Sequence, residues 1–90
     1  MLKIKDNVDL KELEKFGFRY YTGYYGSRGY LKELEYNDDI FIYEDNKKVF
    51  FEIEDFCGDD WNKFCEELVY DLIKADLVEK VDENSEDNNK

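Results

Sequence analysis

The chain has 90 residues and a net charge of −11, from 24 acidic and 13 basic side chains. Its 42% hydrophobic and 18% aromatic content argues against a disordered chain, and its length suits one domain with a modest core. The charge excludes direct binding to nucleic acid, because neutralising phosphates requires cations, and it favours basic partners instead.

A short strand and a short helix are predicted at the N-terminus. Residues 1–5 alternate apolar and basic side chains, which favours a strand. The helix is predicted over residues 9–16, with Asp9 as its N-cap and Glu12 at the capping-box position. Gly17 directly follows the helix and is suited to the left-handed conformation that ends it.

An antiparallel meander of four strands is predicted for residues 18–54. The aromatic run 18–25 and the segment 30–36 are expected to form a hairpin around a turn at residues 26–29. Two further strands are expected at residues 40–44 and 49–54, after polar turns at 37–39 and 45–48.

The C-terminal half contains an amphipathic pattern that predicts one helix over residues 59–75. Its apolar positions recur at the spacing of a single helical face. They are Trp61, Phe64, Cys65, Leu68, Val69, Leu72 and Ile73. Residues 77–81 either continue this helix or form a short strand, and the acidic tail 82–90 is expected to be disordered because it has no apolar residue.

The predicted fold is therefore α+β: a four-stranded antiparallel meander packed by a C-terminal amphipathic helix, with a short N-terminal helix, in a domain of residues 1–81. Alternation assigns one sheet face to the C-terminal helix. That face consists of Ile40, Ile42, Val49, Phe51 and Ile53. The opposite face has Phe41, Tyr43 and Phe50. Helix 9–16 either covers this second face or leaves an exposed aromatic patch.

An exposed aromatic patch would be a surface for protein–protein contact, including self-association as a homodimer. The tyrosines between residues 20 and 36 add rings to the same sheet. A stacking platform for single-stranded nucleic acid would pair such rings with a basic groove. Few cations accompany these tyrosines, so sheet packing and a protein-binding surface are the two interpretations.

The sequence does not indicate an enzyme, a cofactor or a metal site. It has no His, and Cys57 and Cys65 lie eight residues apart, which is not the spacing of a zinc or redox site. Cys65 belongs to the apolar face of the predicted helix, whereas Cys57 beside Gly58 is expected to be more accessible. The carboxylate pairs lack the spacing of a calcium loop. No leader peptide or membrane-spanning stretch is apparent, so we expect a cytoplasmic protein with reduced thiols.

The acidic excess is concentrated in residues 52–90, which contain 14 acids and four Lys. Within the predicted helix, acids mark the side opposite the apolar one. They are Asp59, Asp60, Glu66, Glu67 and Asp71. Carboxylates at helical spacing can imitate a row of phosphates and so occupy the basic surface of a nucleic-acid-binding protein. Lys63 and Lys74 interrupt the row, and a solvated helix face without a partner is the alternative.

The opening segment, from Met1 to Phe18, resembles that of short acidic prophage proteins from low-GC Gram-positive bacteria. The resemblance covers about a fifth of the chain and includes no functional motif, so it transfers no site residue. It implies a mobile-element setting, in which small acidic proteins often inhibit host defence nucleases, as anti-CRISPR and anti-restriction proteins do. A phage-type inhibitor is therefore one form of the expected binding function.

Overall fold

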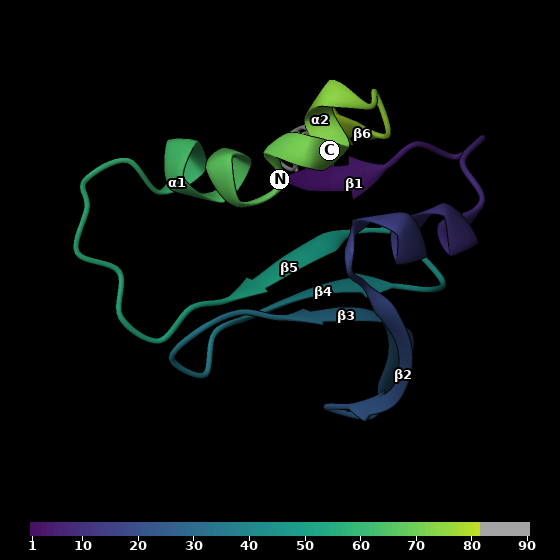
Figure 1. Cartoon of the computed structure of the whole chain (residues 1–90), viewed down its shortest axis with the longest axis horizontal. Helices are drawn as coiled ribbons and strands as arrows, with labels where there is room; N and C mark the ends of the chain where they lie inside the picture. Colours follow the sequence, from purple (N-terminus) through teal and green to yellow (C-terminus); the bar gives the residue numbers. More distant parts are fainter. Residues whose placement is uncertain (82–90) are drawn as a thin grey trace, which may run out of the picture.

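The centre of the fold is a four-stranded antiparallel sheet in the order β2-β3-β4-β5. The structure is a computed structural model and describes residues 1–81 (Figure 1). The strands are β2 (Arg19–Tyr24), β3 (Ser27–Glu33), β4 (Asp39–Tyr43) and β5 (Val49–Glu52). The α+β class and the four-stranded antiparallel sheet are thus confirmed. The tail 82–90, expected to be disordered, lies outside the described residues.

A second, two-stranded sheet joins the two ends of the domain. β1 (Leu2–Ile4) pairs antiparallel with β6 (Val78–Lys80), so the segment whose structure the sequence left open is a strand. The Met1 carbonyl accepts a hydrogen bond of 2.7 Å from the Val81 amide. One backbone bond of 2.8 Å, from the Ile4 amide to the Lys47 carbonyl, ties this ribbon to the β4–β5 turn.

The N-terminal helix forms where it was predicted, as the 3₁₀ helix η1 (Leu10–Phe16). The Asp9 side chain accepts a bond of 3.0 Å from the Lys11 amide, and Gly17 ends the helix with φ 94°. The amides of Gly17 and Phe18 return to the Glu14 and Leu13 carbonyls, the bond pair of a Schellman motif. At seven residues, η1 is longer than the three or four residues usual for a 3₁₀ helix.

The prediction of one continuous helix over residues 59–75 is wrong. The segment forms α1 (Trp61–Leu68) and α2 (Tyr70–Lys74), and the backbone leaves helical geometry at Val69 with φ −116° and ψ 28°. Val69 is only 2% exposed, so its place in the core outweighs the continuity of the helix. The periodicity of the apolar residues did not reveal the break, because Cys65 before it, Val69 at it and Leu72 after it are all buried.

The main core lies between one face of the sheet and the layer formed by both ends of the chain. Figure 1 shows β1, β6, α1 and α2 on the same side of β3–β5, with η1 beside them. Ile40, Ile42 and Val49 of the sheet belong to one buried cluster with side chains of β1, η1 and α2. Leu68 of α1 and Val78 of β6 pack at the margin of this cluster. The other members are Leu2, Ile4, Leu13, Phe18, Tyr30, Val69 and Leu72.

The opposite face of the sheet is covered by the end of β2 and not by the N-terminal helix. β2 curls under the sheet (Figure 1), and its pairing with β3 shifts register between Thr22 and Tyr24. Gly23 permits this shift because its φ of 91° is disfavoured for residues with a side chain. Tyr24 consequently stacks on Phe41, with ring centroids 4.2 Å apart and the planes 10° from parallel.

The first hairpin also has a shorter turn than predicted. Tyr25 and Gly26, with φ of 49° and 84°, make a two-residue turn of the primed type, whose twist matches that of the strands. Residues 27–29, predicted as turn, therefore belong to β3. Gly29 is needed there for close packing, since a Cβ would lie 2.9 Å from the Phe41 ring and would collide with the Ile42 carbonyl.

We predict that Leu72→Ala destabilises the domain by about 2–5 kcal/mol, because Leu72 is 1% exposed and truncation leaves a cavity in the main core. Ile73→Ala is the matched control; Ile73 is 37% exposed, so its loss should be below about 1 kcal/mol. Urea unfolding of both variants measures the difference. Equal losses at the two positions would mean that α2 does not contribute its buried side to the core.

Candidate functional site

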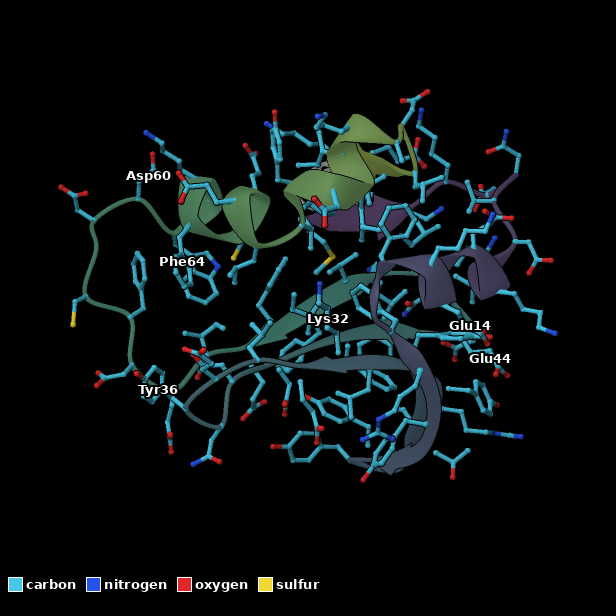
Figure 2. The ribbon with its side chains drawn as sticks, in the orientation of Figure 1. Glu14, Lys32, Tyr36, Glu44, Asp60 and Phe64 are labelled. Carbon is cyan, nitrogen blue, oxygen red and sulfur yellow. The ribbon has the colours of Figure 1, made fainter. Side chains whose placement is uncertain are left out.

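Nine carboxylates gather at one end of the sheet, in two segments of the chain that contain no Lys or Arg. The segments are residues 33–39, which join β3 to β4, and residues 52–60, which lead from β5 to α1. We call them together the acidic end. Its acids are Glu33, Glu35, Asp38, Asp39, Glu52, Glu54, Asp55, Asp59 and Asp60. Tyr36 and Asp60 mark this end in Figure 2, opposite the end that carries Glu14 and Glu44.

The pairing of the strands aligns three of these acids in a row across the sheet. Glu33 of β3 lies directly opposite Asp39 of β4, and Asp39 lies directly opposite Glu52 of β5. Like charges at directly opposed positions destabilise a sheet, by a few tenths to about 1 kcal/mol for each pair. This carboxylate row therefore works against folding, which leaves its presence to be explained by something other than stability.

Ion pairs do little to neutralise the acidic end. Of its nine carboxylates, only Glu33 forms an ion pair within residues 1–81, with Arg19 at 3.5 Å. Elsewhere in residues 1–81, five of the eleven acids are paired, namely Asp6, Glu12, Glu66, Asp76 and Glu79. Within residues 1–81, the negative field is consequently concentrated at this end.

Three acids of this end accept hydrogen bonds from other parts of the domain. Asp38 accepts a bond of 2.9 Å from the Glu54 amide through its Oδ1 atom, which fastens the loop after β5 to the β3–β4 turn. Asp60 caps α1 by accepting from the Lys63 amide at 3.1 Å. In the carboxylate row, Glu52 accepts from the hydroxyls of Tyr24 and Tyr25 at 3.5 and 3.3 Å. The remaining exposed acids, among them Glu35, Asp55 and Asp59, make no such bond in the described residues.

Burial and the neighbouring carboxylates both act on the pKa of Asp39, the central member of the row. The pKa of Asp39 is raised, first because partial burial disfavours its charged form and then because Glu33, Glu52 and Asp38 repel it. Glu52 has a related effect on Tyr25, whose pKa is raised mainly by the negative charge of that carboxylate. The acidic end therefore holds its charges close enough to perturb one another.

The helix row predicted from sequence is divided between this site and other surroundings. Asp59 and Asp60 belong to the acidic end. Glu66 points to β6 and pairs with Lys80 at 3.1 Å, while Glu67 on α1 and Asp71 on α2 lie on either side of the break at Val69. The five residues consequently do not form one continuous row at helical spacing.

The aromatic face predicted from sequence is largely interior. Phe41 is fully buried beneath Tyr24, Tyr43 is partly buried, and Phe50 retains 39% of its exposure. The alternation that placed these three rings opposite Ile40 and Ile42 was correct. The sequence left open whether this face is covered; Phe41 is covered by the curled end of β2 and not by the N-terminal helix.

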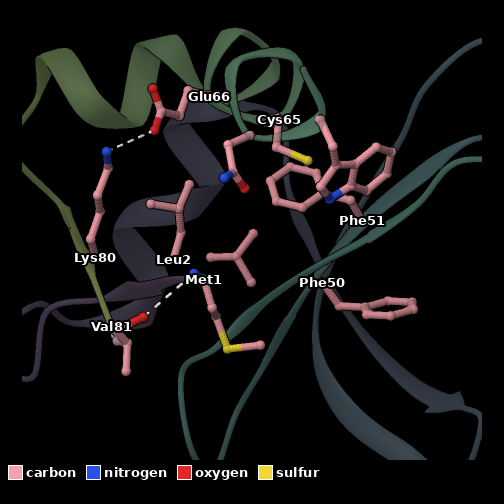
Figure 3. A pocket seen from close by; sticks show the side chains of 11 residues that line it. Met1, Leu2, Phe50, Phe51, Cys65, Glu66, Lys80 and Val81 are labelled. Carbon is pink, nitrogen blue, oxygen red and sulfur yellow. Dashed lines mark hydrogen bonds and ion pairs between the residues drawn. The ribbon is translucent and has the colours of Figure 1, made fainter. Parts of the chain in front are cut away.

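Two grooves on the surface of residues 1–81 differ in their lining. The first, of about 550 Å³, lies between β5, α1 and the β1–β6 ribbon, and its lining includes Phe51, Cys65 and the Glu66–Lys80 ion pair (Figure 3). The second, of about 510 Å³, lies at the acidic end. It is lined by Glu33, Leu34, Glu35, Tyr36, Asp38, Ile53, Phe64 and Leu68. Only the second groove combines apolar side chains with several carboxylates and no cation.

The two cysteines differ in their exposure. Cys65 is 5% exposed, and burial raises its pKa to about 11, whereas Cys57 is exposed on the loop before α1. Within residues 1–81, the carboxylates and thiols form no group of three that could hold a metal ion. None of the helices between residues 1 and 81 is long and apolar enough to span a membrane.

Comparison of the chain with protein-family models, with curated proteins and with solved structures gives no match. The site is accordingly defined by its own geometry: a groove with apolar walls and an acidic rim, beside a row of three carboxylates of which only Glu33 has an ion-pair partner within residues 1–81.

We predict that Asp39→Asn stabilises the protein at pH 7, by up to about 1 kcal/mol, because it removes two like-charge contacts from the row. The raised pKa fixes the pH dependence. Between the unfolded value of 3.8 and the raised native value, the native state binds more protons, so the parent gains stability as the pH falls. The advantage of the variant should therefore vanish near about pH 3. Urea unfolding from pH 3 to 7 tests this, and a pH-independent difference would contradict it.

We predict that a thiol reagent labels one cysteine of the folded protein rapidly and the other only on unfolding. Cys57 is exposed, whereas Cys65 is buried and its raised pKa of about 11 keeps the thiol protonated at neutral pH. Mass spectrometry of the labelled protein, with Cys57→Ser as control, identifies the modified residue. Rapid labelling of the Cys57→Ser variant would show that α1 opens readily.

Proposed function

We propose that the chain is a non-enzymatic binding protein whose acidic end occupies a basic surface on a partner protein. The observation that carries this proposal is the carboxylate row Glu33–Asp39–Glu52, at an end where one of nine acids has an ion-pair partner among residues 1–81. A cationic partner would relieve the repulsion that folding leaves in place. Relief of this repulsion would then contribute favourably to the free energy of binding.

A nucleic-acid-binding protein is the partner class that fits best. The surface of such a protein carries Lys and Arg side chains that neutralise phosphates. Carboxylates at the end of a sheet can take the place of those phosphates. The chain itself, at −11, would be repelled by nucleic acid and would compete with it for the same surface. An inhibitor of a phage defence nuclease, as the prophage resemblance implies, is the narrower form of this proposal, acting in the cytoplasm.

The position of the site also supports binding by this end. The acids lie on a turn and a loop that are anchored to each other by the Asp38–Glu54 bond and to the sheet by β3, β4 and β5. A partner would thus meet carboxylates whose arrangement is largely set before contact, and preorganisation of this kind lowers the entropic cost of binding.

We predict that charge reversal at the acidic end abolishes partner capture and that the same reversal on the helices does not. The test variant is Glu35→Lys with Asp55→Lys and Asp59→Lys, three exposed acids without a structural bond. The control is Glu66→Lys with Glu67→Lys and Asp71→Lys. Three acid-to-Lys changes raise the net charge from −11 to −5 in both variants, so total charge is matched.

The measurement is affinity capture from a bacterial lysate, identified by mass spectrometry, with and without added DNA. We expect the parent and the helix variant to capture a nucleic-acid-binding protein that DNA displaces. Association with the purified partner should be faster at 0.01 M than at 0.15 M salt, as the Debye length falls from about 30 to about 8 Å. Capture that DNA does not compete with, or that the acidic-end variant retains, would contradict the proposal.

A further inference from the structure

The groove at the acidic end has the composition of a docking site for one kind of protein segment. Its apolar lining comes from three separate parts of the chain: Leu34 after β3, Ile53 after β5, and Phe64 with Leu68 on α1. Its polar lining is acidic, from Glu33, Glu35 and Asp38, with Tyr36 beside them. Figure 2 shows Phe64 and Tyr36 on the two sides of this end of the molecule.

The main core uses only some of the apolar side chains that line this groove. Leu34 and Leu68 pack against the margin of the main core, whereas Ile53 is only half-buried and is not part of it. Phe64 is half-buried and contacts Phe56 and Trp61, with ring centroids 4.9 and 5.9 Å away. Tyr36 is 85% exposed, so it leaves a large ring in water at the mouth of the groove.

Charge complementarity selects the occupant. We infer that this groove binds a basic amphipathic segment of the partner protein, with apolar side chains against Ile53 and Phe64 and with Lys or Arg side chains against Glu33, Glu35 and Asp38. This inference rests on the proposed function. It adds that part of the contact with the partner is apolar and is made in this groove. A second copy of the chain fits poorly, because each copy would bring its own acidic rim to the other.

The other groove does not support an equivalent inference. Its charged residues Glu66 and Lys80 neutralise each other at 3.1 Å, so it has no charge preference that would identify an occupant (Figure 3). It serves instead as an internal comparison, since it has an apolar lining but lacks the acidic rim.

The test uses the full chain and three synthetic peptides of about 18 residues, a length of five helical turns. The first has Leu at i, i+3, i+4 and i+7 spacing with Lys elsewhere, and the second has the same composition in scrambled order. The third keeps the Leu pattern and replaces Lys by Gln. Trp61 is the only tryptophan of the chain; it lines the first groove and lies 5.9 Å from Phe64 of the second, so its fluorescence reports binding at either groove and the variants below distinguish the two.

We expect the amphipathic Leu/Lys peptide to bind about tenfold more tightly than the scrambled peptide or the Gln peptide. Ile53→Ser should weaken that binding about tenfold, because the groove loses a buried apolar contact. Ile73→Ser on α2 is the matched control and should have no effect, since Ile73 is exposed away from the groove. Glu33→Gln with Glu35→Gln should weaken binding, and Glu14→Gln with Asp45→Asn should not.

The outcomes separate the inference from the proposed function. Equal binding of the amphipathic and scrambled Lys peptides, or an Ile53→Ser variant that binds like the parent, would overturn the groove while a purely electrostatic function remains. Equal binding of the Gln peptide would overturn the basic occupant and weaken the proposed function as well. Self-association of the parent by sedimentation, abolished by Ile53→Ser, would assign the groove to a second copy and overturn the inference.

A variant that fails to fold does not end the test. Amide chemical-shift changes in the parent, on addition of the Leu/Lys peptide, should concentrate at residues 33–38, 53 and 64–68. Changes confined to the β1–β6 ribbon and Phe50, Phe51 and Cys65 would place the peptide in the other groove and would contradict the inference.

Discussion

The fold depends on the burial of β4 on both of its faces. Ile40, Phe41 and Ile42 are consecutive and have no exposed surface, so each face of this strand must be covered by another layer. In a chain of this length the two coverings come from different sources: the helices and the β1–β6 ribbon on one face, and the curled end of β2 on the other. Neither face of the sheet is then free to bind a partner broadly, and the ends and grooves are what remain.

This constraint explains where the charges lie. A strand buried on both faces cannot carry ionised side chains in its middle, so the acids of β3, β4 and β5 are found where the strands end. Glu33, Asp39 and Glu52 are such terminal residues, and antiparallel pairing brings them side by side. The same pairing that buries the apolar centre of the sheet thus concentrates negative charge at one end, and the aromatic packing of Phe41 and Tyr24 helps to offset the repulsion.

Sequence reasoning succeeded where a pattern is local and failed where packing decides. Alternation correctly separated Ile40 and Ile42 from Phe41, and the residues around Asp9 and Gly17 correctly bounded the first helix. The break at Val69, the curl after Thr22 and the pairing of residues 78–80 with residues 2–4 arise from tertiary contacts that no local pattern encodes. Asp59 and Asp60 of the acidic end were named from the sequence, but Glu33, Asp39 and Glu52 were not, because the predicted row lies along one helix, whereas these three acids stand on separate strands that only pairing brings together.

A signal for the acidic end was nevertheless present in the sequence. In a four-stranded meander, the turn between the second and third strands lies at the same end as the residues that follow the fourth strand. Both of those segments lack Lys and Arg in this chain. Counting charge by sheet end, instead of along the chain, would therefore have identified the site from the predicted topology alone. The same reasoning distinguishes an acidic chain from an acidic site: a uniform excess mainly gives solubility, whereas cation-free segments that the fold brings together produce a directed field.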